Sequence, residues 1–128
     1  MLRVKRIYEK KSPEDGIRIY IDRLWPRGLT KEKAAMDEWL KDMSPSEDLR
    51  KWFGHEREKF PEFKQKYVWE LSNPAAAEKL KYIADLAQKQ NVTLLYSAKD
   101  EKYNNAGVAA ELVNALMKKT SPGKNSVR

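Results

Sequence analysis

The apolar residues of the chain follow two different periods, and the period of two marks the strands. Residues 17–23 read Ile-Arg-Ile-Tyr-Ile-Asp-Arg, with isoleucine at every second position, which predicts a strand that buries one face. Residues 92–98 read Val-Thr-Leu-Leu-Tyr-Ser-Ala, an almost continuous apolar run that is typical of a central strand covered on both faces. Residues 2–8 form a shorter β-leaning segment, and turn formers follow at residues 12–16.

Elsewhere the apolar residues recur at intervals of three and four, as they do on the buried face of a helix. Ser44, Pro45 and Glu47 form a helix-start signal, and Asn73 with Pro74 forms another. Residues 36–43 are ambiguous between helix and strand. Helices are expected over residues 30–35, 45–53, 60–71, 74–89 and 105–118.

This order of elements predicts an α/β fold with a small, mixed, mainly parallel sheet of about three to four strands, flanked by about five helices. The long helical middle favours a right-handed parallel crossover into residues 92–98. The connection between the first two strands is too short for a helical crossover, which favours a mixed sheet. We expect one domain over residues 1–119 and a flexible C-terminal tail over residues 120–128.

Composition narrows the chemistry. The 128 residues carry a formal net charge of +7, with one His and no Cys. The absence of Cys excludes disulfides, thiolate zinc sites and cysteine nucleophiles, and a lone His excludes a histidine zinc site within one chain. Any metal would have to bind carboxylates, and we predict neither a metal nor a cofactor. No apolar run is long enough to cross a membrane and the basic N-terminus leads into a charged segment, so a cytoplasmic protein without membrane partners is expected.

The positive charge is concentrated toward the two ends of the sequence. Residues 1–33 hold ten basic and five acidic side chains, and residues 91–128 hold six and three. The middle is nearly balanced, as solvated helix faces are. Because two of the arginines fall in one short loop, the charge favours a local anion site over a diffuse basic surface.

The predicted strands at residues 17–23 and 92–98 each end in a polar loop that leads into a helix. In α/β sheets ligands bind beyond the carboxyl ends of the strands, so a site is expected at these two loops. Two guanidinium groups beside a helix N-terminus suit a phosphate or a carboxylate, and an indole ring suits stacking on a base or a sugar. The candidate ligand-binding residues are Arg23, Trp25, Arg27 and Gly28 in the first loop and Ser97, Lys99, Asn104 and Asn105 in the second.

The candidate catalytic residues are Asp22, Asp100 and His55. Two aspartates that approach each other would act as general acid and base, or hold Mg²⁺, and His55 has the ordinary imidazole suited to proton transfer near neutrality. Structural interpretations stay open for the same side chains. Asp22 would pair with a neighbouring arginine, Trp25 would cover the end of the sheet, and His55 would cap a helix.

Several segments of the chain form recognisable motifs. They are Asp-Arg-Leu-Trp-Pro-Arg-Gly at residues 22–28, Trp-Leu at 39–40, Ser-Pro-Ser at 44–46, Leu-Arg-Lys-Trp-Phe-Gly-His at 49–55, and residues 92–106. In these motifs the sequence resembles the YeaO-like family, which belongs to the larger group called domain of unknown function 488. The resemblance spans roughly residues 2–118.

The resemblance implies a small cytoplasmic α/β protein of bacterial or archaeal type. The broader group tends to carry an arginine-rich loop after an early strand, which corresponds to Arg23 and Arg27. It also tends to carry a segment with Cys or His after a late strand, whereas residues 99–106 here contain neither. Thiol or imidazole chemistry of the group therefore does not transfer to this loop.

These observations favour a domain that binds a small anionic ligand, phosphate or carboxylate, with hydrolase or transferase activity as a further possibility. The alternative is a nucleic-acid-binding or regulatory module that uses the net positive charge, although no basic recognition helix is evident. A third interpretation is an interaction or structural module in which both loops serve stability.

Overall fold

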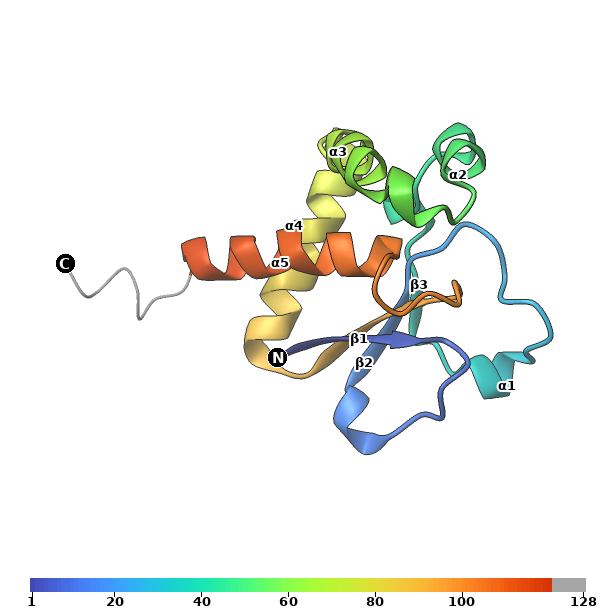
Figure 1. Ribbon diagram of the computed structural model, residues 1–128. Coiled ribbons are helices and arrows are strands. Elements are labelled where there is room, and N and C mark those ends of the chain that lie inside the picture. The colour runs from blue at the N-terminus through green and yellow to red at the C-terminus, as the bar shows by residue number, and fades with distance from the viewer. Residues whose placement is uncertain (121–128) are drawn as a thin grey trace.

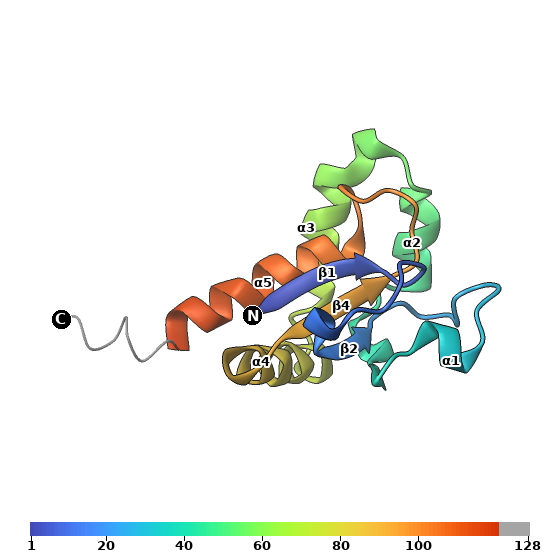
Figure 2. The same ribbon diagram turned by 90° about the horizontal axis from the view of Figure 1, so that it is seen from below.

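Four parallel strands form the sheet of the computed structural model, which describes residues 1–120 (Figure 1). They are β1 (Leu2–Arg6), β2 (Ile17–Tyr20), β3 (Glu38–Trp39) and β4 (Val92–Tyr96). Their order across the sheet is β1-β4-β2-β3. Viewed from below, β1, β4 and β2 lie side by side and run in the same direction (Figure 2). The predicted α/β class and strand number are confirmed.

β4 is the central strand that its apolar run predicts. All five of its residues are buried, and it pairs with β1 on one side and β2 on the other. In this register Val92 lies opposite both Leu2 and Ile17. The predicted strands extended further, to residues 23 and 98, but the sheet ends at Tyr20 and Tyr96. The polar ends of both segments therefore enter the loops beyond the sheet.

The sheet is parallel throughout, which corrects the expectation of a mixed one. β1 and β2 are not neighbours, because β4 lies between them, so the short connection joins two strands that do not pair. The connection from β1 to β2 contains a 3-10 turn at Pro13–Asp15. Gly16 ends it with a φ of 63°, and a Cβ there would lie 2.0 Å from the carbonyl oxygen of Asn91. Only glycine fits so close an approach in that conformation.

The five expected helices are present. They are α1 (Lys31–Ala34), α2 (Glu47–Phe53), α3 (Phe60–Glu70), α4 (Pro74–Lys89) and α5 (Asn105–Thr120). The ambiguous residues 36–43 contain β3 and a 3-10 turn. α5 includes Thr120, the first residue of the predicted tail, and residues 121–128 lie outside the described part of the chain. None of the described helices is long and apolar enough to span a membrane.

The helix-start signal at residues 44–47 is displaced by two residues. Ser46 is the N-cap of α2, because its hydroxyl accepts a hydrogen bond from the amide of Leu49. Ser44 instead donates its hydroxyl to the carbonyl of Lys41. The cap is therefore the second serine of the Ser-Pro-Ser segment, and Glu47 is the first residue of the helix.

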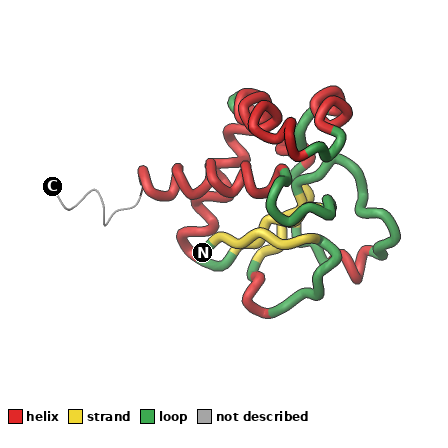
Figure 3. Tube along the Cα trace, in the orientation of Figure 1, coloured by secondary structure: helices red, strands yellow, loops and turns green. Residues whose placement is uncertain are grey.

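The two faces of the sheet are covered differently. Ile19 and Leu94 point to the face packed by α3, α4 and α5, whereas Tyr20 and Leu95 point to the face covered by Ala34 of α1. The connections after β1 and β2 cross one face and the long return from β3 crosses the other, as crossovers of one hand require. The strand-end loops gather at one end of the sheet, on the right in Figure 3.

Candidate functional site

Asp22 joins the two loops that the sequence predicted to converge. Its Oδ2 accepts hydrogen bonds from the amide and the hydroxyl of Ser97, at 2.9 and 2.7 Å. Its Oδ1 accepts a hydrogen bond from Asn105 Nδ2 at 2.8 Å. One carboxylate thereby ties the end of β2 to the end of β4 and to the first turn of α5. After these neighbouring strands the chain leaves toward opposite faces, which makes this a topological switch point.

The loop between β4 and α5 is ordered by its own polar side chains. Asp100 Oδ1 accepts hydrogen bonds from the amides of Lys102 and Tyr103, and Oδ2 accepts one from Arg57 Nε at 2.9 Å. These contacts, the backbone ones above all, lower the pKa of Asp100. Buried Asn104 donates to the carbonyl of Asp100 and accepts from the amide of Gly107, so it caps α5.

The loop after β2 is held by aromatic side chains. Trp25 Nε1 donates to the carbonyl of Leu29 at 2.8 Å, and its ring packs edge-on against Trp39 at 5.6 Å between centroids. Trp39 Nε1 donates in turn to the carbonyl of Asp22. From the end of β1, the Tyr8 hydroxyl donates to the carbonyl of Arg27 at 2.7 Å. The loop therefore has a fixed shape although much of it is exposed.

A cavity of about 770 Å³ lies between these loops and α2. Ten of the eleven predicted site residues line it. The exception is Gly28, whose φ of 81° indicates a role in the turn. The ten are Asp22, Arg23, Trp25, Arg27, His55, Ser97, Lys99, Asp100, Asn104 and Asn105. Their shared location meets the geometric requirement of a site, and the predicted catalytic and binding roles remain predictions.

Sequence reasoning missed several residues of the cavity wall. Arg6 comes from the end of β1, and Arg50 and Lys51 come from α2. Each of these cations lies in a segment whose pattern indicates only a strand or an amphipathic helix. Their convergence depends on the docking of α2 over the strand ends, for which the sequence offers no local signal.

The charge of the cavity is strongly positive. Six Arg and Lys side chains line it against the carboxylates of Asp22 and Asp100. Arg6 Nε donates to the carbonyls of Ser97 and Ala98, and Lys51 pairs with exposed Glu47. Within residues 1–120, the side chains of the other four cations form no hydrogen bond or ion pair. They are Arg23, Arg27, Arg50 and Lys99.

His55 lies at the wall of the cavity just after α2. Gly54 caps the helix in the left-handed conformation, and His55 follows with a φ of 61°. Its ring is 6.0 Å from that of Phe53 and is exposed to solvent. The helix end is thus capped by backbone geometry, and the His55 side chain is left available on the cavity side.

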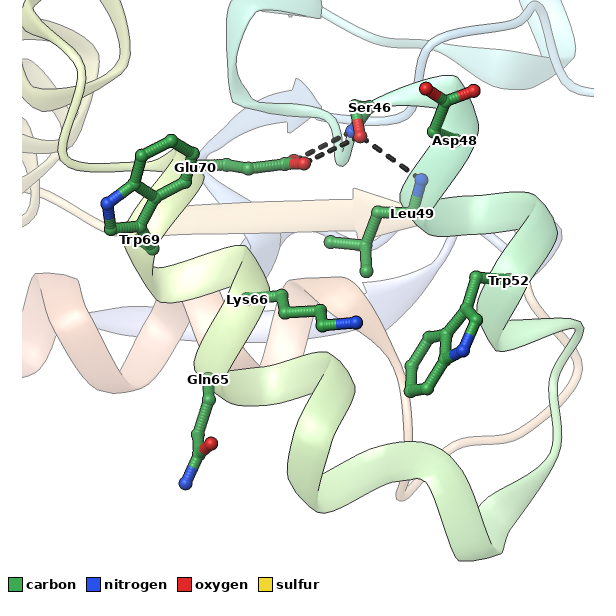
Figure 4. A pocket seen from close by; sticks show the side chains of 8 residues that line it. All are labelled: Ser46, Asp48, Leu49, Trp52, Gln65, Lys66, Trp69 and Glu70. Atoms are coloured by element: carbon green, nitrogen blue, oxygen red, sulfur yellow. Dashed lines mark hydrogen bonds between the residues drawn. The ribbon is translucent and has the colours of Figure 1, made fainter.

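A second hollow of about 580 Å³ lies between α2 and α3 (Figure 4). Ser46 and Glu70 are hydrogen-bonded to each other there, and Lys66 lies over the ring of Trp52 at 4.2 Å. Its polar groups are thus largely engaged with their neighbours, and it lacks the cluster of unpaired cations. Among the described residues, no three Asp, Glu or His side chains are arranged to hold a metal ion.

The fold and the site describe a small α/β protein with a parallel sheet and a cation-lined cavity at the strand ends. The chain belongs to the DUF488 family: the family profile described as "Inactive DUF488-N3 subclade" matches residues 1–127. It is a YeaO-like member of that family, as its 43% identity to the uncharacterized protein YeaO indicates.

The relatives are bacterial proteins of nearly the same length. The uncharacterized protein YeaO of Escherichia coli (strain K12) is 43% identical over 115 residues, which cover 90% of this chain and 98% of that protein. The uncharacterized protein Rv3073c of Mycobacterium tuberculosis (strain ATCC 25618 / H37Rv) is 37% identical over 113 residues, covering 88% and 93%. No solved structure shows a significant match.

Proposed function

We propose that the cavity at the carboxyl ends of β2 and β4 binds a small ligand that carries a phosphate or a carboxylate. The observation that carries the proposal is the set of four cations on the cavity wall that lack a partner among the described residues. Like charges gathered around one hollow repel one another, and an anion bound between them relieves that repulsion. Arginine also grips phosphate and carboxylate groups through two parallel hydrogen bonds.

Binding is better supported than catalysis. The Asp22 carboxylate already accepts three hydrogen bonds, and that of Asp100 accepts three as well. Carboxylates engaged in this way position the loops and are poorly placed to exchange protons with a ligand. The family description, which calls this subclade inactive, agrees with a binding role. The proposal keeps the cytoplasmic location expected from the sequence.

Calorimetric titration with pyrophosphate at low ionic strength tests the proposal. R27Q is expected to weaken binding by about ten- to a hundredfold, because one charge-assisted contact contributes roughly 1.5–3 kcal/mol. R3Q is the matched control, because Arg3 lies in β1 outside the cavity and its replacement removes the same charge. Equal losses in both variants, or no binding by the unaltered chain, would contradict the proposal. A large fall in the melting temperature of R27Q would indicate a structural role instead.

The net charge of +7 keeps nucleic acid as the second candidate. Binding of a nucleic acid to the surface and binding of a small anion in the cavity differ in their salt dependence. A nucleic-acid strand releases counterions for each of its phosphates that the protein contacts, so its binding weakens more steeply with salt. If R3Q and R27Q abolish retention on single-stranded or duplex DNA equally, nucleic-acid binding by the basic surface of the protein is favoured. Binding of pyrophosphate with a shallow salt dependence would favour the cavity.

A further inference from the structure

We propose that the ligand of this cavity is a nucleotide, whose base stacks on Trp25 while its phosphate lies among the arginines. This inference rests on the proposed anion site and adds the class of molecule. The cavity holds about 770 Å³, far more than a phosphate ion needs and within the range of pockets that enclose a whole small molecule. The remaining volume has room for a second part of the ligand, which side chains other than the cations would contact.

Two aromatic side chains at the cavity wall supply that element. Trp25 is 40% exposed and Tyr8 is 38% exposed, and both line the cavity. Aromatic rings left half in water are typical of surfaces that bind a partner. A planar, apolar face beside a group of cations matches a base attached to a phosphate better than it matches a simple carboxylic acid.

Both rings are fixed before any ligand arrives. Trp25 is tethered to the carbonyl of Leu29, and Tyr8 is tethered to the carbonyl of Arg27 in the same loop. One face of the Tyr8 ring is covered by the guanidinium of Arg6 at 4.7 Å, whereas the ring of Trp25 forms a T-shaped contact with that of Trp39. Among the described residues no cation lies over the Trp25 ring, so a base stacks on it without displacing one. Little entropy is lost in that step, because the ring is already fixed.

The arginines lie beside these rings in the chain itself. Arg23 and Arg27 flank Trp25 within five residues, so the phosphate and base subsites belong to one loop. Base stacking on an aromatic side chain tolerates every base, because every base presents a π-face. The site should therefore recognise nucleotides as a class before it distinguishes among bases.

Titration of the unaltered chain with AMP, ribose 5-phosphate and pyrophosphate tests the inference directly. AMP is expected to bind about tenfold more tightly than ribose 5-phosphate, the contribution of one stacked base. Equal affinities of AMP and ribose 5-phosphate would overturn the nucleotide assignment and leave the anion site standing. Absence of binding by all three would overturn both.

Substitutions of two tryptophans test whether the base stacks on Trp25. W25L is expected to abolish the roughly tenfold preference for AMP over ribose 5-phosphate, because the stacked base loses its partner. W69L is the matched control, because Trp69 is 76% exposed and lies at the other hollow (Figure 4). An equal effect of W69L, or none of W25L, would overturn the placement of the base. Because the ligand series uses the unaltered chain, it decides the inference even where W25L does not fold.

One further arm identifies the source of the nucleotide. A single-stranded tetranucleotide that competes with AMP and binds more tightly at physiological salt would show that the site takes a nucleotide of a strand. Preference for AMP would show that it takes the free molecule. Either result supports the assignment, and failure of both to compete with pyrophosphate would overturn it.

Discussion

Asp15 gathers its donors from three parts of the chain onto one buried carboxylate. Lys5 Nζ lies 3.0 Å from Oδ1, Arg18 Nη1 lies 2.6 Å from Oδ2, and the amide and hydroxyl of Ser12 complete the set. The fully buried Arg18 guanidinium also donates to the carbonyls of Ala34 and Ala35. This network closes the turn before β2 and links it to α1, on the face of the sheet that has few helices.

Asp15 is expected to make the protein less stable at acidic pH. Burial would raise its pKa, but the hydrogen bonds from Ser12, Lys5 and Arg18 outweigh burial and lower the pKa from 3.8 to about 2. Because the unfolded chain binds this proton more readily, the contribution is full above about pH 4 and is lost as pH falls toward 2. It amounts to about 2 kcal/mol, measurable by urea unfolding at stepwise lower pH.

The variant D15N should flatten that pH dependence. It is also expected to reduce the free energy of unfolding at pH 7 by about 3 kcal/mol, because Arg18 stays buried without its counterion. D48N is the matched control, since Asp48 is exposed at the start of α2. A D15N protein that kept the full slope between pH 4 and pH 2 would show that other carboxylates carry the acid sensitivity.

Helix α2 depends on a contact from outside itself. With seven residues it is too short to be stable alone, yet it supplies Arg50, Lys51 and Phe53 to the cavity. Its N-cap Ser46 donates its amide and its hydroxyl to the carboxylate of Glu70, at 2.8 and 2.6 Å (Figure 4). The last turn of α3 thus holds the first turn of α2 in place.

A double-mutant cycle on this contact tests the dependence. S46A and E70Q are each expected to cost about 1–2 kcal/mol in urea unfolding, with a coupling of about 1 kcal/mol between them. S44A is the control for the position of the cap, because Ser44 lies outside α2 and its hydroxyl donates to the carbonyl of Lys41. A larger loss in S44A than in S46A would place the cap where the sequence signal had suggested.

The hydrophobic pattern predicted those strands whose own residues are enough to mark them. The alternating isoleucines of residues 17–21 mark β2, and the apolar run from Val92 marks β4, which is buried along its length. The alternation did not indicate that Arg18 and Tyr20, on the other face of β2, are buried as well. β3 was not predictable, since two residues, Glu38 and Trp39, carry no period. Its place is fixed by pairing with Ile19 and Tyr20, a contact between distant parts of the chain.

Some residues of the candidate site were likewise predictable from the sequence, and others were not. Except for His55, which follows α2, the residues found from sequence lie in loops that directly follow the two marked strands. Their convergence was predictable from the parallel arrangement of those strands. Arg6 and Arg50 were missed because the first depends on strand order and the second on helix docking. Asp22 was singled out as a proton-transfer group, whereas its three hydrogen bonds in the structure tie the loops together.

The arrangement of the sheet predicts a gradient of local stability that ends at the exposed edge. β4 is paired on both sides and wholly buried, whereas β3 pairs over two residues, with its flanking amides of Asp37 and Leu40 donating to β2. Amides of Leu94 and Leu95 should therefore exchange with solvent only through global unfolding, and those of Asp37 and Leu40 through local opening, about a hundredfold faster or more.

Native-state hydrogen exchange at increasing sub-denaturing urea separates these two routes. Exchange through global unfolding exposes the whole core and accelerates steeply with urea, whereas local opening exposes little surface and is nearly insensitive to it. Steep and equal urea dependence for the β3 and β4 amides would show that the sheet opens as one unit. The expected difference would leave β2 and β4, the strands whose ends form the cavity, as the rigid platform on which the ligand-binding loops are held.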